Sequence, residues 1–385
     1  MRTFATPGVY REDAFQPRPA ELPTGVPVFL GFAEGGKHNQ PERLTARRHF
    51  ADVFGQATRW LAVAVEGFFA NEGEECFVVR LDETAGLRAA LDAGLKAAGS
   101  LVDVDLVCTP DAFHRYEKQH DETRVWEDKL RAEALQLQNV VLAHCDARGD
   151  RLALLDAPPG ALSVLVRQHR DGLTGTNGAF YYPWVQPVGR TDFAPPCGHV
   201  AGVIARTDRR RGVHKPPANE VLQGVADLER ILTDADQAEL NPVGINALRA
   251  FPGRGLRVWG ARTVAKGPAS SYVSVRRLFL TAARWIERNL AAASFEPSDL
   301  RLWNRITREL TVYFESLFAA GALKGRTPAE AFYVKCDAAT NPPEVREAGM
   351  VVTEIGLAPA LPNEFVIVRI RHGPGGVEVS GPSAG

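Results

Sequence analysis

Several patterns that mark large classes of proteins are absent from this sequence. Its five cysteines, among 385 residues, are an odd number without a CxxC pair, which argues against a disulfide framework and against a zinc site. No stretch reaches the ~18 apolar residues that a membrane-spanning helix needs. The formal net charge of −1 gives the whole surface no attraction for nucleic acid or anionic membranes. We therefore predict buried, reduced thiols, no nucleic-acid partner and no membrane association by the chain itself.

Glycine-rich motifs that could bind phosphate are incomplete. Glu34–Gly36 follows an apolar segment, but no GxGxxG pattern and no Walker lysine completes a phosphate cradle. Gly253–Gly255 lies between a proline and an expected strand, which favours a hairpin or a bend over a nucleotide site. The sequence therefore predicts no cofactor.

Three short clusters of histidine and charged residues suggest catalysis or metal binding. They are His114/Glu117/His120, His144–Asp146 with Cys145 at its centre, and His169–Asp171. The first lies in a polar passage without an apolar stripe to orient it. In the second, sequence neighbours do not face one another, and we expect the end of a strand there. The third lacks the glycine-rich loop, lysine and metal ligands of kinases. We predict no catalytic and no metal-binding residues.

A basic run at Arg206–Gly212 could bind nucleic acid. It has no interleaved aromatic residues, and a charge run of this kind is usually a solvated face. We expect a solvated surface here.

Apolar strands alternate with amphipathic helices along the chain, which indicates an α/β region followed by an α+β region. Strands are expected at 26–32, 76–81, 101–108, 140–144, 256–263, 331–336, 350–358 and 364–371. Helices are expected at 42–54, 58–70, 85–98, 124–139, 161–169, 273–293 and 298–320. A proline-rich and glycine-rich passage, roughly 172–220, interrupts this alternation.

The two ends differ from the middle of the chain. The first 25 residues carry four prolines and little periodicity, which is typical of an extended segment. We divide the chain into an extended N-terminal arm (1–25), an α/β region (26–220), an α+β domain (221–363), and a C-terminal strand arm with a flexible tail (364–385). The predicted fold class is thus α/β and α+β, with two domains and extended β-arms at both ends.

The expected helix 298–320 has two unlike faces. Trp303, Ile306, Leu310, Tyr313, Phe314 and Leu317 fall on one face at helical spacing. Arg301, Arg305 and Arg308 lie together on the opposite face. Ser298 is the predicted N-cap, and Asp299 is the predicted acid of the first turn. The basic face is either solvated or docks onto an acidic partner.

With these features in place, the chain resembles the tail sheath family of contractile phages, R-type bacteriocins and extracellular contractile injection systems. The resemblance is carried by Gly244–Thr263 (GINALRAFPGRGLRVWGART), Tyr272–Leu278 (YVSVRRL), Ala331–Asp337 (AFYVKCD), Pro362–Ile367 (PNEFVI) and Thr6–Tyr10 (TPGVY). It extends to Ala205–Asn219, where His214 replaces the family's usual tryptophan and Pro216 its usual alanine. It is weaker over 75–190.

This resemblance implies a structural sheath subunit. Copies would form hexameric rings stacked helically around an inner tube protein, bounded by baseplate and terminator or cap proteins, and contraction would need no nucleotide. Neighbouring subunits would exchange terminal arms as β-strands, through Thr6, Pro7, Gly8, Val9 and Tyr10 and through Phe365, Val366, Ile367 and Val368. Arg301, Arg305 and Arg308 would contact an acidic tube.

Two alternatives stay open from the sequence. One is an end-specific sheath paralogue at the baseplate or cap, and the other is an α/β hydrolase-like enzyme. Residues 1–15 lack the apolar core of a secretory signal, so we expect assembly in the bacterial cytoplasm. The expected product is a phage tail or tail-like particle, which a route without a signal peptide would release.

Overall fold

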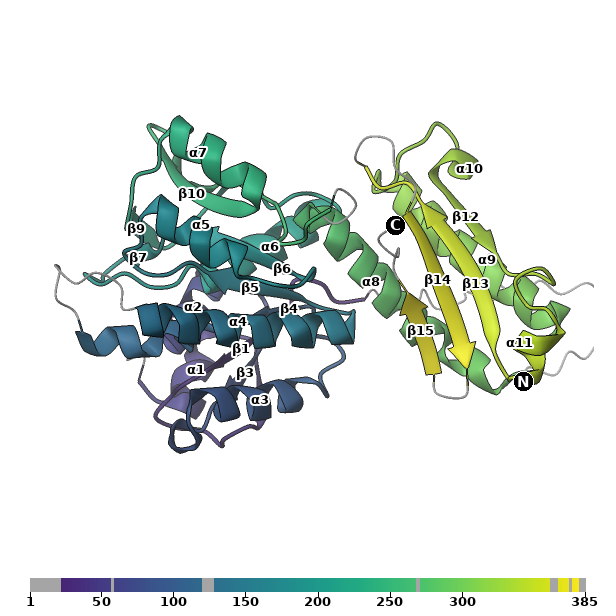
Figure 1. Cartoon of the computed structure of the whole chain (residues 1–385), viewed down its shortest axis with the longest axis horizontal. Coiled ribbons are helices and arrows are strands. Elements are labelled where there is room, and N and C mark those ends of the chain that lie inside the picture. Colours follow the sequence, from purple (N-terminus) through teal and green to yellow (C-terminus); the bar gives the residue numbers. More distant parts are fainter. Residues whose placement is uncertain are drawn as a thin grey trace, which may run out of the picture.

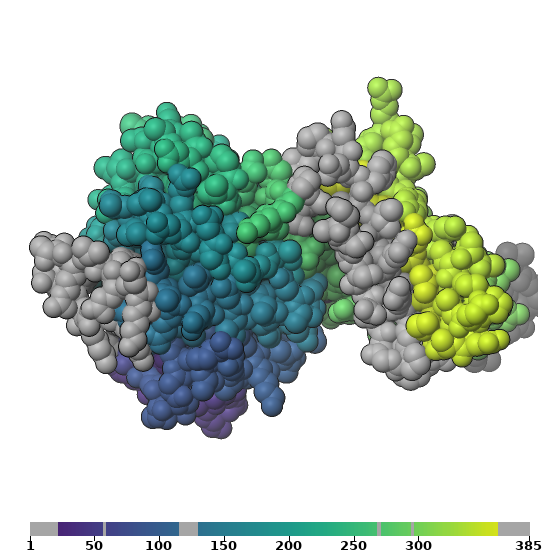
Figure 2. Space-filling model, in the orientation of Figure 1, coloured from purple at the N-terminus to yellow at the C-terminus, as the bar shows by residue number. Residues whose placement is uncertain are grey.

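Two lobes, joined by the long helix α8 (Val273–Leu290), make up the computed structural model (Figure 1). The structure describes residues 22–56, 59–119, 128–267, 271–360, 366–373 and 376–380. Figure 2 shows the same chain in a space-filling view, in the same orientation. The first lobe is built on a mostly parallel sheet and the second on an antiparallel one. The predicted succession of an α/β and an α+β region is therefore confirmed.

Nine strands of the described residues form the sheet of the first lobe. In spatial order they are β2 (Pro41–Leu44), β3 (Cys76–Arg80), β1 (Pro27–Gly31), β4 (Leu106–Cys108), β5 (Leu152–Asp156), β6 (Gly178–Tyr182), β10 (Ile245–Phe251), β11 (Gly255–Val258) and β8 (Glu220–Val221). The central strands from β3 to β10 pair in parallel, and antiparallel pairs close both edges. A short two-stranded sheet, β7 (Val185–Pro187) with β9 (Val225–Leu228), lies beside it.

Helices cover both faces of this sheet (Figure 1). One face packs against α1 (Arg47–Phe54), α2 (Trp60–Ala70) and α6 (Cys197–Arg211), and the other against α3 (Leu87–Ala98), α4 (Asp128–Arg148), α5 (Ser163–Asp171) and α7 (Asp234–Leu240). Side chains alternate accordingly along β1, where Phe29 joins one core and Val28 and Leu30 join the other. Short 3₁₀ segments lie at Glu83–Ala85, Pro110–Gln119, Asn241–Val243 and Ala291–Phe295. The strands read as continuous apolar runs because both faces of the sheet are buried.

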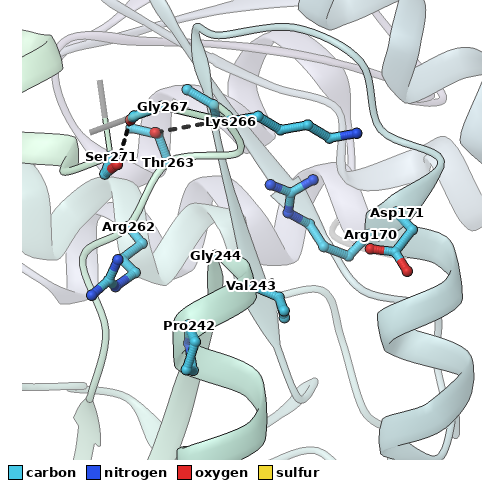
Figure 3. A pocket seen from close by; sticks show the side chains of 11 residues that line it. Arg170, Asp171, Pro242, Val243, Gly244, Arg262, Thr263, Lys266, Gly267 and Ser271 are labelled. Atoms are coloured by element: carbon cyan, nitrogen blue, oxygen red, sulfur yellow. Dashed lines mark hydrogen bonds between the residues drawn. The ribbon is translucent and has the colours of Figure 1, made fainter. Parts of the chain in front are cut away.

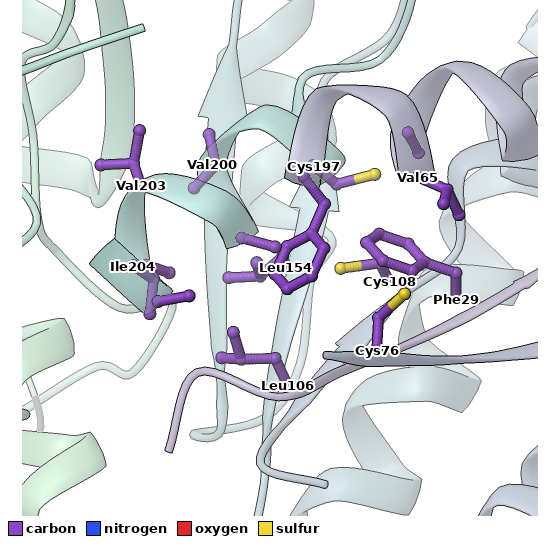
Figure 4. Close-up of a cluster of buried hydrophobic side chains, with 14 of the residues drawn as sticks. Phe29, Val65, Cys76, Leu106, Cys108, Leu154, Cys197, Val200, Val203 and Ile204 are labelled. Carbon is purple, nitrogen blue, oxygen red and sulfur yellow. The ribbon is translucent and has the colours of Figure 1, made fainter. Parts of the chain in front are cut away.

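All five cysteines are buried free thiols, as predicted. Figure 4 shows Cys76, Cys108 and Cys197 around Phe29 in the core beneath α2 and α6. Burial raises the pKa of the Cys76 and Cys197 thiols well above the ordinary value, so they stay protonated and unreactive. These thiols act as small apolar core residues.

Helix α4 overturns one prediction. The expected strand 140–144 is the C-terminal part of this helix, which runs to Arg148. Leu137, Val141 and Cys145 are spaced by four residues and all belong to one core cluster. The apolar run resembles a strand in isolation, but its side chains fit the helical spacing of the preceding turns. Similarly, the expected helix 42–54 begins only at Arg47, because residues 41–44 pair with β3.

Helix α6 lies inside the passage that we expected to be irregular. It packs so closely on α2 that a Cβ on Gly198 would lie 2.0 Å from the Ala64 carbonyl oxygen. The predicted solvated face of the basic run is therefore wrong for its first half, because Arg206 and Asp208 are buried. The second half is exposed and bonded to acids, with Arg210 at 2.7 Å from Glu72.

The second lobe is a two-layer α+β unit. Its antiparallel sheet has the order β12 (Phe332–Lys335), β13 (Val351–Leu357), β14 (Val366–Gly373), β15 (Gly376–Ser380). Helices α8 and α9 (Leu300–Ala319) supply its core with the sheet, while α10 (Pro328–Ala331) and α11 (Pro343–Glu347) are short connections. This core cluster is separate from the two of the first lobe.

A buried ionic network fastens α8 to the first lobe. Arg277 donates two hydrogen bonds to the Asp208 carboxylate, at 2.7 and 2.5 Å, and a third to Asp105 at 2.7 Å. Asp105 also accepts the backbone N–H groups of Gly25 and Val26. Two turns further, Arg284 donates to the carbonyls of Pro23, Val102 and Asp103. The network thus joins α8, the sheet and the segment that enters β1.

Candidate assembly interface

Helix α9 presents one apolar face to the second lobe. The Asp299 carboxylate caps its start by accepting the backbone N–H groups of Arg301 and Leu302, at 2.9 and 3.0 Å. Its buried side chains recur at helical spacing: Leu302, Trp303, Ile306, Leu310 and Phe314. Tyr313 stacks on Trp285 of α8, with 4.0 Å between ring centroids. The predicted apolar face is confirmed, whereas the capping residue is Asp299 and not the predicted Ser298.

The predicted arginines on the outer side of α9 differ in their surroundings. Arg301 and Arg308 are exposed, and within the described residues no ion pair engages either side chain. Arg305 is half-buried and lies 2.5 Å from Glu296 and 3.8 Å from Glu309. The unneutralised positive charge of this helix face therefore comes from Arg301 and Arg308.

Apolar side chains accompany these two arginines. Leu300 and Val312 are 65% and 63% exposed, and they lie at helical spacing with Arg301 and Arg308. We call these four residues the α9 outer face. A surface that combines exposed apolar groups with arginine is more typical of an interface core than of a solvated helix.

The sheet of the second lobe offers backbone edges. Within the described segments, β12 and β15 are its edge strands, and β14 pairs with β13 in a register running from Val351↔His372 to Leu357↔Val366. The predicted strand at 364–371 is confirmed, and in the single chain Val366, Ile367 and Val368 pair with the chain's own β13. Phe365 and the N-terminal residues Thr6, Pro7, Gly8, Val9 and Tyr10 lie outside the described residues. An edge strand of this kind can accept a further strand from another chain.

The side chains of His144, Cys145 and Asp146 lie in three different environments. Cys145 is buried in the core, and burial raises the pKa of its thiol. Burial lowers the pKa of His144 to about 4. Asp146 accepts the backbone N–H groups of Thr176 and Asn177 and thereby fixes the loop before β6. These three residues do not converge on one reaction site.

The other two clusters are also parts of the packed structure. His169 is buried, stacks on Phe180 with 5.8 Å between ring centroids, and shares a 2.8 Å hydrogen bond with Gln138. Burial lowers the pKa of His169 to about 3, so it is neutral. His114 lies in the 3₁₀ segment Pro110–Gln119, and His120 lies outside the described residues. Among the described residues, no group of three or more His, Cys, Asp or Glu side chains could hold a metal ion.

Residues Gly253–Gly255 form the expected hairpin. β10 and β11 pair antiparallel up to Phe251↔Gly255, and Gly253 and Gly255 take the positive φ values of 72° and 74° that the turn requires. None of the helices in the described segments combines the length and the apolarity that crossing a bilayer requires.

Comparison with known proteins agrees with the resemblance noted in the sequence. Residues 130–264 match the family model of the phage tail sheath protein central domain. The tail sheath protein of Vibrio phage KVP40 is 25% identical over 197 residues, which cover 50% of this chain and 28% of that protein. The chain thus spans less than a third of the length of this curated relative. The matched part of the chain is thus similar to the tail sheath family.

Solved structures are similar to this chain in their overall fold. A chain in the baseplate of the anti-feeding prophage has a TM-score of 0.74 and 29% identity, covering 94% of this chain and 98% of that chain. A chain in the contracted sheath complex of PVC, an extracellular contractile injection system, has a TM-score of 0.73 and 27% identity, covering 94% and 96%. Over nearly its whole length, the chain therefore has the fold of sheath proteins from extracellular contractile systems.

The junction arginines were not singled out from the sequence. Arg277 and Arg284 lie at helical spacing with Val273 and Leu280, on the buried side of α8. An arginine at the apolar positions of an amphipathic helix is the signal that could have revealed them, because such a charge must find a buried partner.

Proposed function

We propose that this chain is the structural subunit of a contractile sheath. Copies form hexameric rings stacked helically around an inner tube, and contraction drives the tube through a target envelope. The observation that carries the proposal is the match to a contracted-state sheath chain over 94% of this chain and 96% of the other. Heterologous contacts between identical subunits generate such open helical assemblies.

Terminal arms connect neighbouring subunits in this proposal. We assign residues 1–25 and 364–385 to arms. The predicted boundary at residue 220 between the α/β region and the α+β domain lies too early, because β10 and β11 belong to the sheet of the first lobe. Strand addition to the edges of the second-lobe sheet joins the subunits through backbone hydrogen bonds, with Thr6–Tyr10 and Phe365–Val368 as the added strands. Such a hinge keeps subunits connected while their bodies move.

The α9 outer face contacts the inner tube in this proposal. Arg301 and Arg308 supply the charge, and Arg305 contributes less because Glu296 and Glu309 already neutralise it. Replacing Arg301, Arg305 and Arg308 with glutamate should abolish extended particles and leave contracted sheaths without tubes. Normal extended particles from that variant would contradict the assignment.

Negative-stain electron microscopy of the purified chain tests polymerisation directly. We expect hollow, helically striated tubes from the recombinant full-length chain alone. Deletion of residues 1–22 removes the N-terminal arm and should give separate subunits. If the full-length chain stays monomeric under all salt conditions, a self-assembling sheath is ruled out.

A baseplate-end role is the second candidate. It is favoured by the similarity to a chain in a baseplate structure, at a TM-score of 0.74. Quantitative mass spectrometry of purified particles separates the two roles, because a main sheath is present in many copies and an end-specific one in about six or fewer. Partners in either case are other copies of the chain, the tube, the baseplate and the terminator or cap. Assembly takes place in the bacterial cytoplasm, and no enzymatic step is involved.

A further inference from the structure

A basic pocket lies on the first lobe, and none of the residues that border it belongs to α9 or to the second-lobe sheet. Its volume is about 410 Å³, and it is bordered by the end of α5, the Pro242–Gly244 turn, residues between 262 and 267, and Ser271. Figure 3 shows the side chains of Arg170 and Lys266 extending into the same space. Arg262 also borders the pocket, so its lining includes three basic residues.

The positive charge of this pocket is not neutralised within the described residues. No ion pair there engages Arg170, Arg262 or Lys266. Asp171 also borders the pocket, but Figure 3 shows its carboxylate turned away from the guanidinium of Arg170. Arg262 lies over the ring of Tyr272, at 5.1 Å from its centroid, which orients it without cancelling its charge. The pocket therefore holds three cations against one remote acid.

Arg170 carries the strongest indication of a missing partner. It is 5% exposed, and its Nη2 donates to the Val264 carbonyl at 2.6 Å. Its Nε is buried without a hydrogen-bond partner. A buried guanidinium with an unused donor is costly unless an anion completes its hydrogen bonds. The planar fork of an arginine matches the geometry of a carboxylate or a phosphate.

The backbone is shaped to leave this space open. Gly244 has a φ of 80°, and a Cβ there would lie 2.6 Å from the Thr263 carbonyl oxygen and 3.3 Å from Nη2 of Arg170. A side chain at this position would push the turn and Arg170 apart. Gly244 thus allows the turn to lie directly against the guanidinium.

We propose that this pocket binds an acidic side chain from a second copy of the chain, which makes it a lattice contact of the assembled sheath. This inference rests on the proposed function. The chain carries 46 acidic residues beside its 45 basic ones, so a second copy brings acidic side chains that can enter the pocket. A neighbouring copy therefore supplies the complementary charge, and the pocket gives the contact its register.

Zero-length carbodiimide cross-linking tests the contact, because it joins an amine only to a carboxylate in direct contact. Tubes are assembled from a mixture of ¹⁵N-labelled and unlabelled full-length chain, cross-linked and analysed by mass spectrometry. We expect a mixed-label cross-link between Lys266 and an Asp or Glu, absent from unassembled protein. Tubes that form without this cross-link, while other lysines are cross-linked, would overturn the pocket assignment alone. A failure to form tubes would overturn the proposed function and, with it, the second copy as occupant.

Neutralising variants provide the second measurement. Arg262→Gln with Lys266→Gln should leave the melting temperature of the dilute subunit unchanged and weaken tube assembly about tenfold, as expected for one lost charge-assisted contact. Arg48→Gln with Arg47→Gln, which changes the same charge on the exposed side of α1, should assemble like the wild type. Inorganic phosphate serves as the competing probe. If wild-type tubes are insensitive to the pocket variant while the unassembled wild type binds phosphate there, the pocket takes a free anion and the proposal fails.

Discussion

Replacing Arg277 with methionine is the most informative perturbation of this fold. The change keeps an unbranched apolar stem but removes three hydrogen bonds of 2.5 to 2.7 Å and leaves Asp208 buried beside an empty space. The side chains of Arg277 and Asp208 are each only 3% exposed. Breaking a buried ion pair by removing one partner costs ~3–5 kcal/mol, a large part of the ~5–15 kcal/mol that stabilises a typical domain. We expect a loss of that size in the free energy of unfolding.

The loss should depend on pH with a defined sign. Burial raises the pKa of Asp208 even with Arg277 present, so folding favours its protonated form. A carboxyl group whose pKa is raised on folding stabilises the protein below its unfolded pKa and loses that contribution as the pH rises. Without Arg277 the pKa rises further. The Arg277→Met variant should therefore be more stable at pH 5 than at pH 8.

Urea unfolding of the dilute, unassembled subunit measures these effects. Adding Asp208→Asn to Arg277→Met should recover about half of the lost stability or more, because the buried charge is gone while Asp105 keeps its two backbone donors. Arg288→Met is the matched control: its ion pair with Asp103 is 3.4 Å long and half exposed, so the loss should stay below ~1 kcal/mol. Equal losses for Arg277→Met and Arg288→Met, or a loss independent of pH, would refute this reasoning.

Three further predictions concern other parts of the molecule. Burial raises the pKa of Asp156 to about 7, so the contribution of its protonated form to stability is lost as the pH rises through 7. The variant Asp156→Asn keeps an acceptor for the backbone N–H of Cys197. It should raise the urea midpoint at pH 8 and have little effect on the midpoint at pH 4. Phe314→Ala should lower the stability of the second lobe by ~3–5 kcal/mol, measured by calorimetry, whereas Val312→Ala on the exposed side should change it by less than ~0.5 kcal/mol. Arg301→Glu with Arg308→Glu should abolish extended particles in electron micrographs as fully as the triple variant does, while Arg305→Glu alone should leave most particles extended.

Periodic patterns allowed much of the second lobe to be predicted from sequence. The apolar spacing of α9 and its Asp299 cap are local signals, and they depend little on the rest of the fold. The same applies to the hairpin at Gly253–Gly255, where positive φ values require glycine. Elements that are defined by local signals, such as a helix cap or a glycine turn, can therefore be predicted without tertiary information.

Buried elements were harder to predict, because a helix or strand that packs on all sides is apolar all round and shows no alternation of apolar and polar residues. Helix α6 is buried nearly all round, so its apolar residues show no stripe, and its glycines suggested a loop although they permit contact with α2. The prediction for the 140–144 segment of α4 failed for a related reason, since the short apolar run from Val140 to Ala143 resembles a buried strand. The basic pocket joins α5, the Pro242–Gly244 turn and Lys266, which are far apart in sequence, and no local pattern connects them.

The contact between Arg284 and the Pro23 carbonyl also has a mechanical meaning. Residues 23–26 are hydrogen-bonded to α8 and to Asp105 at the junction of the two lobes. A force that pulls on the chain before residue 23 is therefore applied to the subunit at this junction. The force then acts close to α8 and produces little rotation about this helix. The buried ionic network of Arg277 and Arg284 transmits the force to both lobes. A tether anchored there can drag a subunit without peeling a strand from its sheet.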